Sequence, residues 1–288
     1  MSTIDYHIHT VFSTDADHTP QEIVAMAKKN GVRRFAVADH NRIDNIQKTK
    51  ELAEKEGITV VPGVEIDCES EGVHFHMTAY RFDLQDPFFD ELYHFYYDQN
   101  RVNTWKAKEQ FCQAMGLQIP DEQLQPYAKD GILVPEEIAA YLLSHSEYDD
   151  LSWLDPYRPG GKRSDNPNVN FYWDFFSQGK PGATKGKTLS ADEVIRRVHQ
   201  AHGLCVIAHP GANFREHEDV LERLLDKVDG MEVYSSYHTL EQTQHYHRLA
   251  CERGLLISCG SDFHGHHKPM IEVGKIPFLQ NETEIALF

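Results

Sequence analysis

Short apolar runs recur along this chain, each bounded by residues typical of turns or of helix starts. Runs of this length that are rich in Val, Ile and aromatic side chains are typical of β-strands. We therefore predict seven strands, at residues 4–8, 34–38, 58–66, 73–80, 204–208, 231–234 and 255–259.

Helix signals separate several of these strands. Three segments begin with a Ser or Thr cap followed by an acidic or amide residue and end at a glycine: residues 19–31, 190–203 and 239–254. Strands that alternate with helices favour parallel pairing, and seven such units fit a barrel better than an open sheet.

The alternation stops between residues 86 and 185. A long helical stretch runs towards Met115, and Pro135 begins a shorter helix. We predict an α/β fold in which residues 1–85 and 186–288 form a barrel. Residues 86–185 would then be an inserted helical lid that governs substrate choice.

Composition narrows the class of protein. The 288 residues include 28 basic and 45 acidic side chains, giving a net charge of −17. Such a surface repels nucleic-acid backbones and anionic membranes, so we expect neither as a stable partner. The five cysteines form no C-x-x-C pair, and the chain shows no signal peptide or membrane span, so we expect a cytoplasmic protein.

Imidazole and carboxylate side chains lie in or just after six of the seven predicted strands. Neutral ring nitrogens and hard oxygens together suit Zn²⁺, Mn²⁺ or Fe²⁺. The residues concerned are His7, His9, Asp39, His40, Glu65, His76, His209, Asp262 and His264. Because His7 and His9 alternate in a strand, both face the same side and can bind one ion together.

These residues form a set of motifs: H-x-H at 7–9, D-H-N at 39–41, G-V-E-I at 63–66, A-H-P-G at 208–211 and S-D-x-H at 261–264. The set resembles the PHP (polymerase and histidinol phosphatase) family of metal-dependent phosphoesterases, over about residues 4–80 and 190–264. That resemblance implies a distorted (β/α)₇, TIM-like barrel with two to three divalent ions at the carboxyl ends of its strands.

The resemblance also implies how the ligands are shared. One ion would be held by His7, His9, Glu65 and Asp262, and a second by Glu65, His76 and His209. A third would be held by Asp15, His40 and His264. Asp17 or His18 is an alternative to Asp15, because this chain has one extra residue after the first motif. His74 is interpreted as a solvated or supporting imidazole.

The expected chemistry is hydrolysis of a phosphate ester. Three carboxylates and three divalent ions leave a net charge of about +3, which suits a phosphate dianion, and a bridging hydroxide would be the nucleophile. The substrate class would be a small phosphorylated metabolite, such as a nucleotide or ribose phosphate, including a 3′,5′-bisphosphate or cyclic phosphate.

Several alternatives stay open within and beyond this chemistry. The chain could be a phosphoribosyl cyclic phosphate phosphodiesterase, a histidinol-phosphate phosphatase or an exonuclease that trims oligonucleotides. A structural metal-binding module is the non-enzymatic alternative. Amide hydrolysis is less favoured, because no lysine stands at a matching strand end.

The remaining candidates concern the substrate. Asp39 could orient an imidazole or transfer a proton, and His238 is the candidate general acid. Ser235 could reach the leaving group. Arg101, Lys180 and Arg215 could bind phosphate, although each could equally be a solvated charge. The aromatic run at 171–176 could stack on a base or belong to a core.

Overall fold

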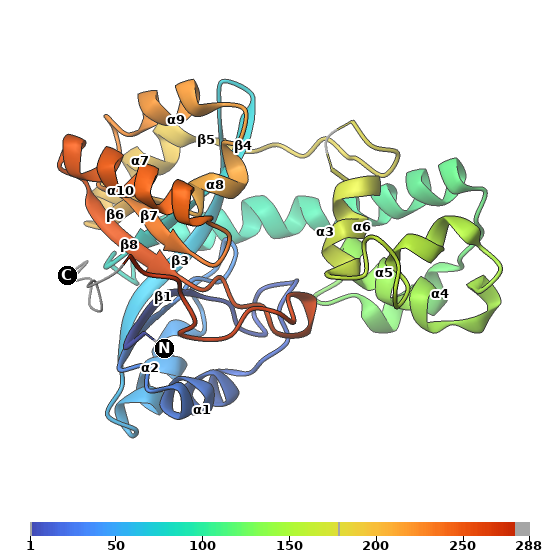
Figure 1. Cartoon of the computed structure of the whole chain (residues 1–288), viewed down its shortest axis with the longest axis horizontal. Coiled ribbons are helices and arrows are strands. Elements are labelled where there is room, and N and C mark those ends of the chain that lie inside the picture. Colours follow the sequence, from blue (N-terminus) through green and yellow to red (C-terminus); the bar gives the residue numbers. More distant parts are fainter. Residues whose placement is uncertain (1, 178, 280–288) are drawn as a thin grey trace. The chain divides into compact units, whose positions relative to one another are not determined.

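The computed structural model describes residues 2–177 and 179–279. Contacts divide the chain into two compact units, both visible in Figure 1. The barrel unit comprises residues up to 93, residues 188–265 and those from 271 onward. The helical unit comprises residues 94–187 and 266–270.

The barrel unit is built on one mixed sheet. Its strand order is β1-β2-β3-β4-β6-β7-β8, and β5 pairs with β3. The strands are β1 (Ile4–Ile8), β2 (Arg34–Val37), β3 (Thr59–Ser70), β4 (Val73–Tyr80), β5 (Leu189–Ser190), β6 (Leu204–Ile207), β7 (Gly230–Ser235) and β8 (Leu256–Gly260). The predicted α/β barrel is thereby confirmed.

The segment that follows β8 brings the sheet close to a closed barrel. His9 N donates to Phe263 O at 3.0 Å, and Asp262 N donates to His7 O at 2.8 Å. Phe263 also forms a parallel bridge with Ile8. The first strand and the last segment of the sheet are therefore joined.

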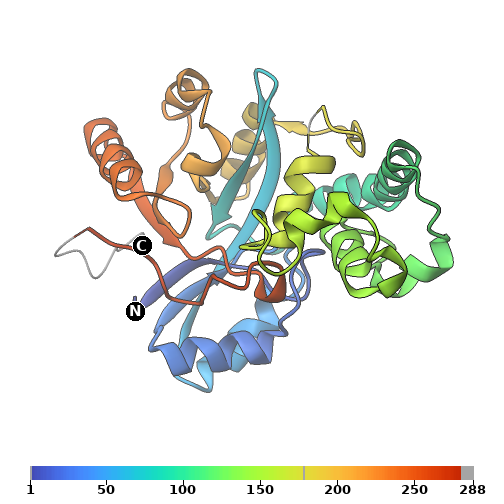
Figure 2. The same cartoon turned by 45° about the vertical axis from the view of Figure 1, so that its right-hand side comes forward.

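The prediction of parallel pairing throughout is wrong at β4. β3 and β4 form the long antiparallel hairpin seen in Figure 2, and β4 also runs antiparallel to β6. Glu71 and Gly72 make the turn, with φ angles of 53° and 81°. Two residues with positive φ match a hairpin turn, whereas a parallel connection needs a crossover of a dozen or more residues.

The barrel helices are α1 (Pro20–Asn30), α2 (Ile46–Glu54), α7 (Ala191–Gln200), α8 (Pro210–Asn213), α9 (Glu218–Leu224) and α10 (Leu240–Arg253). The predicted N-terminal caps are present, but α7 ends at Gln200, before the predicted stop at Gly203. Thr19 and Glu22 form a capping box that opens α1, and Gly31 ends that helix in the left-handed region with φ 78°. Ile23 and Ala27 of α1 pack against Phe35 of β2 in a buried core.

The helical unit has its own core. It contains most of α3 (Phe88–Met115), then α4 (Asp121–Leu124), α5 (Pro135–Ser144) and α6 (Pro167–Phe175). Short 3₁₀ turns lie at Gln125–Tyr127, Ser146–Tyr148 and Ser152–Tyr157, and a fourth at Gly265–His267. Phe171 and Phe176 are buried around Phe111, so these two rings of the aromatic run belong to the core and cannot stack on a base.

Two further predictions concern the cysteines and membrane-spanning helices. All five cysteines are free thiols. Among residues 2–177 and 179–279, no helix has the length and apolar character needed to cross a membrane.

Candidate metal centre

The structure brings together all nine residues that the sequence singled out as ligands, and all nine lie in the barrel unit. They extend from β1, β2, β3, β4, β6 and β8 or from the loops that follow them: His7, His9, Asp15, His40, Glu65, His76, His209, Asp262 and His264. Two of them, His209 and Asp262, have positive φ angles of 26° and 57°. Such backbone strain is typical of functional sites.

The first group surrounds one carboxylate oxygen of Glu65. Glu65 Oε2 lies 3.2 Å from His7 Nε2 and 3.1 Å from His9 Nε2. Asp262 Oδ1 lies 3.4 Å and 3.1 Å from the same two nitrogens. These side chains are almost completely buried, so four potential ligand atoms face one another away from bulk solvent.

The other oxygen of Glu65 faces a second group. Glu65 Oε1 lies 2.9 Å from His209 Nε2 and 3.0 Å from His76 Nδ1. Glu65 therefore stands between two histidine groups. His74 is exposed, and its Nδ1 lies 3.4 Å from Thr188 Oγ1.

The third group is centred on Asp15. Its Oδ2 lies 3.3 Å from His264 Nε2 and 3.6 Å from His40 Nε2. Asp17 Oδ1 instead lies 2.7 Å from the Nδ1 of its neighbour His18. The geometry thus favours Asp15 over either alternative.

Hydrogen bonds fix the tautomers of three of these histidines. The Nδ1 atoms of His7, His9 and His264 lie 2.8 Å from Glu232 Oε2, 2.9 Å from Ser13 Oγ and 2.9 Å from the carbonyl oxygen of Asp262. A ring nitrogen facing a carboxylate or carbonyl oxygen must carry the proton. In the neutral imidazoles that metal ligation requires, the Nε2 atoms are then left with lone pairs directed at the centre.

Asp39 belongs to this supporting network. Its carboxylate accepts hydrogen bonds from Thr10 N at 2.7 Å, Ser13 Oγ at 2.9 Å and Asn45 Nδ2. Because the Ser13 hydroxyl donates to Asp39, its oxygen accepts from His9. Asp39 is buried, and burial raises its pKa. This arrangement supports an orienting role through Ser13 and His9.

The donor set fits divalent cations. His7 Nε2, His9 Nε2, Glu65 Oε2 and His76 Nδ1 are buried without a hydrogen bond of acceptable geometry to the described residues. Burial lowers the pKa of His7, but the neighbouring carboxylates Glu65, Glu232 and Asp262 outweigh it and hold that pKa well above its usual value. The strongly negative potential that causes this shift is suited to cations.

His238 does not have the geometry expected of a general acid. Its Nδ1 donates to Val233 O at 2.8 Å, and its Nε2 accepts from Gly211 N at 3.1 Å. Burial lowers the pKa of this imidazole. It is therefore held neutral, with both nitrogens used by the backbone, and it ties β7 to the turn that carries His209.

The predicted substrate residues have different environments. Ser235 is fully buried. Arg101 donates to Asp98 Oδ1 at 2.7 Å and to Asp130 O at 2.9 Å, so its guanidinium group is used within the helical unit. Lys180 is an exposed residue of the same unit.

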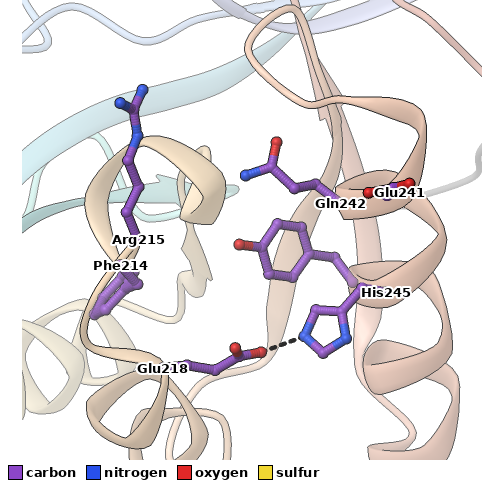
Figure 3. A pocket seen from close by; sticks show the side chains of 7 residues that line it. Phe214, Arg215, Glu218, Glu241, Gln242 and His245 are labelled. Carbon is purple, nitrogen blue, oxygen red and sulfur yellow. Dashed lines mark hydrogen bonds and ion pairs between the residues drawn. The ribbon is translucent and has the colours of Figure 1, made fainter.

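Arg215 lines a cavity of about 300 Å³ in the barrel unit. Figure 3 shows Phe214 and Arg215 across this cavity from Gln242, Glu241 and His245. Arg215 Nε donates to Gly211 O at 3.2 Å. No ion pair joins Arg215 to a carboxylate within the described residues. Arg215 shares the cavity with two carboxylates, Glu218 and Glu241, of which Glu218 pairs with His245.

Sequence reasoning missed three residues of the site. Glu232 contacts His7, and Tyr237 Oη donates to Asp262 Oδ2 at 2.7 Å. Asp67 Oδ1 lies 3.3 Å from His76 Nε2. A charged residue in the apolar run at 231–234 was a visible signal for Glu232. Asp67 and Tyr237 follow predicted strands, but polar residues there are common.

A family model described as PHP domain matches residues 5–152, about half of the chain. A 5′-3′ exoribonuclease of Haemophilus influenzae is 28% identical over 265 residues, covering 90% of this chain and 89% of that protein. A 3′,5′-nucleoside bisphosphate phosphatase of Chromobacterium violaceum is 23% identical over 281 residues, covering 95% of this chain and 91% of that protein.

A solved structure has the same fold. It is that of an amidohydrolase from Chromobacterium violaceum with bound sulfate and no metal. The TM-score is 0.80 at 22% sequence identity, covering 97% of this chain and 93% of that one. At this identity, the likeness concerns the fold.

Proposed function

Because the chain belongs to the PHP domain family, we propose that it is a phosphoesterase that binds three divalent ions, Mn²⁺, Fe²⁺ or Zn²⁺. Its substrate would be a small, ribose-containing phosphate ester. The observation that carries this proposal is the position of Glu65, whose two oxygens face different histidine groups at 2.9–3.3 Å. A carboxylate in that position can bridge two ions.

Each group of side chains would hold one ion. The first comprises His7, His9, Glu65 and Asp262, the second Glu65, His76 and His209, and the third Asp15, His40 and His264. When bound, such ions lower the pKa of water and stabilise negative charge on phosphoryl oxygens.

The protein's own groups would keep this centre ordered. Asp39 and Ser13 orient His9, and Tyr237 orients Asp262. Burial of these contacts excludes competing water from the ligand atoms. His9 and His264 stack with ring centroids 3.8 Å apart, which further restricts both rings.

Arg215 supports a substrate with a second phosphate group. It is exposed, held through Nε by Gly211 O, and has no carboxylate partner among the described residues. The resemblance to a 3′,5′-nucleoside bisphosphate phosphatase agrees with this choice. Lys180 is the second proposed phosphate ligand.

A second candidate is exonucleolytic trimming of short RNA, favoured by the resemblance to an exoribonuclease. The net charge of −17 weighs against it, because long polyanions would be repelled.

The test is hydrolysis of a panel of matched substrates by the Mn²⁺-loaded protein, measured as phosphate release from the monoesters and bisphosphate and as new products by chromatography for the cyclic phosphate and the RNA. The panel should include an adenosine 3′,5′-bisphosphate, the corresponding monophosphates, a ribose cyclic phosphate, histidinol phosphate and a short 5′-phosphorylated RNA. We expect the bisphosphate to have the highest kcat/KM. Preference for the RNA would favour the second candidate. Absence of hydrolysis of every substrate, at full metal content, would refute the phosphoesterase proposal.

A further inference from the structure

Glu232 is a carboxylate behind the metal centre that the proposed function does not use. It lies in the middle of β7, where every residue is buried, and its own exposure is 0%. An ionised carboxylate in such a strand is costly unless a positive group or hydrogen-bond donor compensates it. The groups around Glu232 should therefore show what compensates its charge.

Within the described residues, His7 is the only side chain that forms a hydrogen bond or ion pair with Glu232. Glu232 Oε2 lies 2.8 Å from His7 Nδ1, and the other oxygen, Oε1, has no hydrogen-bond partner in that part of the chain. The opposite nitrogen of the same ring, Nε2, faces Glu65 and Asp262 at 3.2 Å and 3.4 Å. His7 therefore lies between one carboxylate behind it and two in front.

Gly260 provides the space for this pair. A Cβ atom at Gly260 would lie 2.1 Å from the Cβ of His7 and 3.2 Å from Glu232 Oε2. Any larger residue there would displace the imidazole. Three strands, β1, β7 and β8, thus contribute to a single imidazole–carboxylate contact.

We propose that Glu232 is a positioning residue for the metal centre, acting through His7. By accepting the Nδ1 proton, it keeps the Nε2 lone pair directed at Glu65 and Asp262, and it adds a third negative charge to the first ligand group. This inference rests on the proposed metal centre.

The equivalent contacts of two other histidines are neutral. His9 Nδ1 faces a serine hydroxyl, and His264 Nδ1 faces a backbone carbonyl. Of these three tautomer-setting contacts, the one to His7 alone uses a carboxylate. Its removal should therefore reduce cation affinity through charge as well as through ring orientation.

The test compares Glu232→Gln with Glu252→Gln, which removes the same charge from an exposed position on α10. Zn²⁺ and Mn²⁺ affinities are measured by competition with a chromophoric chelator, and metal content by elemental analysis. Glu232→Gln should bind the tightest ion about 10- to 100-fold more weakly. The metal-free thermal midpoint of both variants serves as the control for folding.

Glu232→Gln affinities within two-fold of those of Glu252→Gln would overturn the role of Glu232. Failure of the wild-type protein to bind metal would instead overturn the proposed function. If Glu232→Gln does not fold, the tautomer can be read from ¹⁵N-histidine NMR of the Zn²⁺-loaded wild type. A protonated His7 Nδ1, assigned through His7→Gln, supports the proposal, whereas a protonated Nε2 refutes it.

Discussion

Glu65 combines two properties at the scale of single residues. It is fully buried, and it contacts histidines through both oxygens. Burial raises the pKa of its carboxyl group, but the surrounding imidazoles His7, His76 and His40 outweigh burial and hold that pKa well below its usual range. The carboxylate is therefore charged at neutral pH and available to two cations.

Glu65→Gln should reduce turnover more than 100-fold, beyond the range of about 10- to 100-fold for residues that only support a ligand. The amide lacks the charge and presents only one ligand oxygen, so two ions should be disturbed together. Elemental analysis beside steady-state kinetics measures both effects, with circular dichroism as the control for folding. Wild-type turnover at full occupancy would contradict the bridging assignment.

His238→Ala should destabilise the fold without changing which groups titrate in catalysis. It leaves Gly211 N and Val233 O without their partners, at a cost of about 1–3 kcal/mol for each buried group. Urea denaturation measures the loss. The kcat–pH profile should keep its shape, and the disappearance of one limb would restore His238 as the general acid.

At this scale the sequence predicted which side chains lie close together, because each of the relevant strand ends carries a histidine or a carboxylate. It failed for contacts that depend on strand order around the barrel. His7 and Glu232 are 225 positions apart, and their contact requires β1, β7 and β8 to be neighbours. No local pattern carries that information.

At the scale of elements, caps were readable because their signals are local. Thr19 and Thr239 each form the expected capping box, and Gly31 and Gly254 each end a helix. The direction of the strands could not be predicted from local signals of this kind. The apolar runs of β3 and β4 lie close together in the sequence, but β3 continues through polar residues to Ser70, which leaves two residues for the turn.

Arg215 belongs to the short connection between α8 and α9, and its substitution by Ala tests that element. KM for a 3′,5′-bisphosphate should rise about ten-fold or more, the scale of losing a charged hydrogen bond of about 1.5–3 kcal/mol. A monophosphate should be little affected. Lys180→Ala is the parallel variant in the helical unit. Equal effects on both substrates would show that Arg215 and Lys180 do not bind the second phosphate group.

At the scale of the whole molecule, both the net charge and the metal centre affect the stability of the fold. A net charge of −17 opposes compaction, whereas bound cations would neutralise carboxylates in the barrel unit. The mixed α/β barrel was predictable from the run of apolar segments. The boundary between the two units was less predictable, because α3 is one continuous helix from Phe88 to Met115 that belongs to both units.

Removing metal with a chelator should lower the thermal midpoint by several degrees. A ligand present at 100 times its Kd stabilises the folded state by about 2.7 kcal/mol per site. Differential scanning calorimetry of wild type and Glu65→Gln, with and without chelator, measures the effect. The variant should show the smaller shift. An unchanged wild-type midpoint would contradict the expectation that bound metal stabilises the fold.

The segment that joins the first and last strands also carries Asp262 and His264. Cation binding and the pairing of β1 with residues 261–263 thus depend on the same few peptide units. If these units detach, the backbone groups of β1 and β8 lose their partners and become available to other chains. Bound metal at the centre would then prevent self-association of the protein. Solubility during long storage, like turnover, would depend on trace metal.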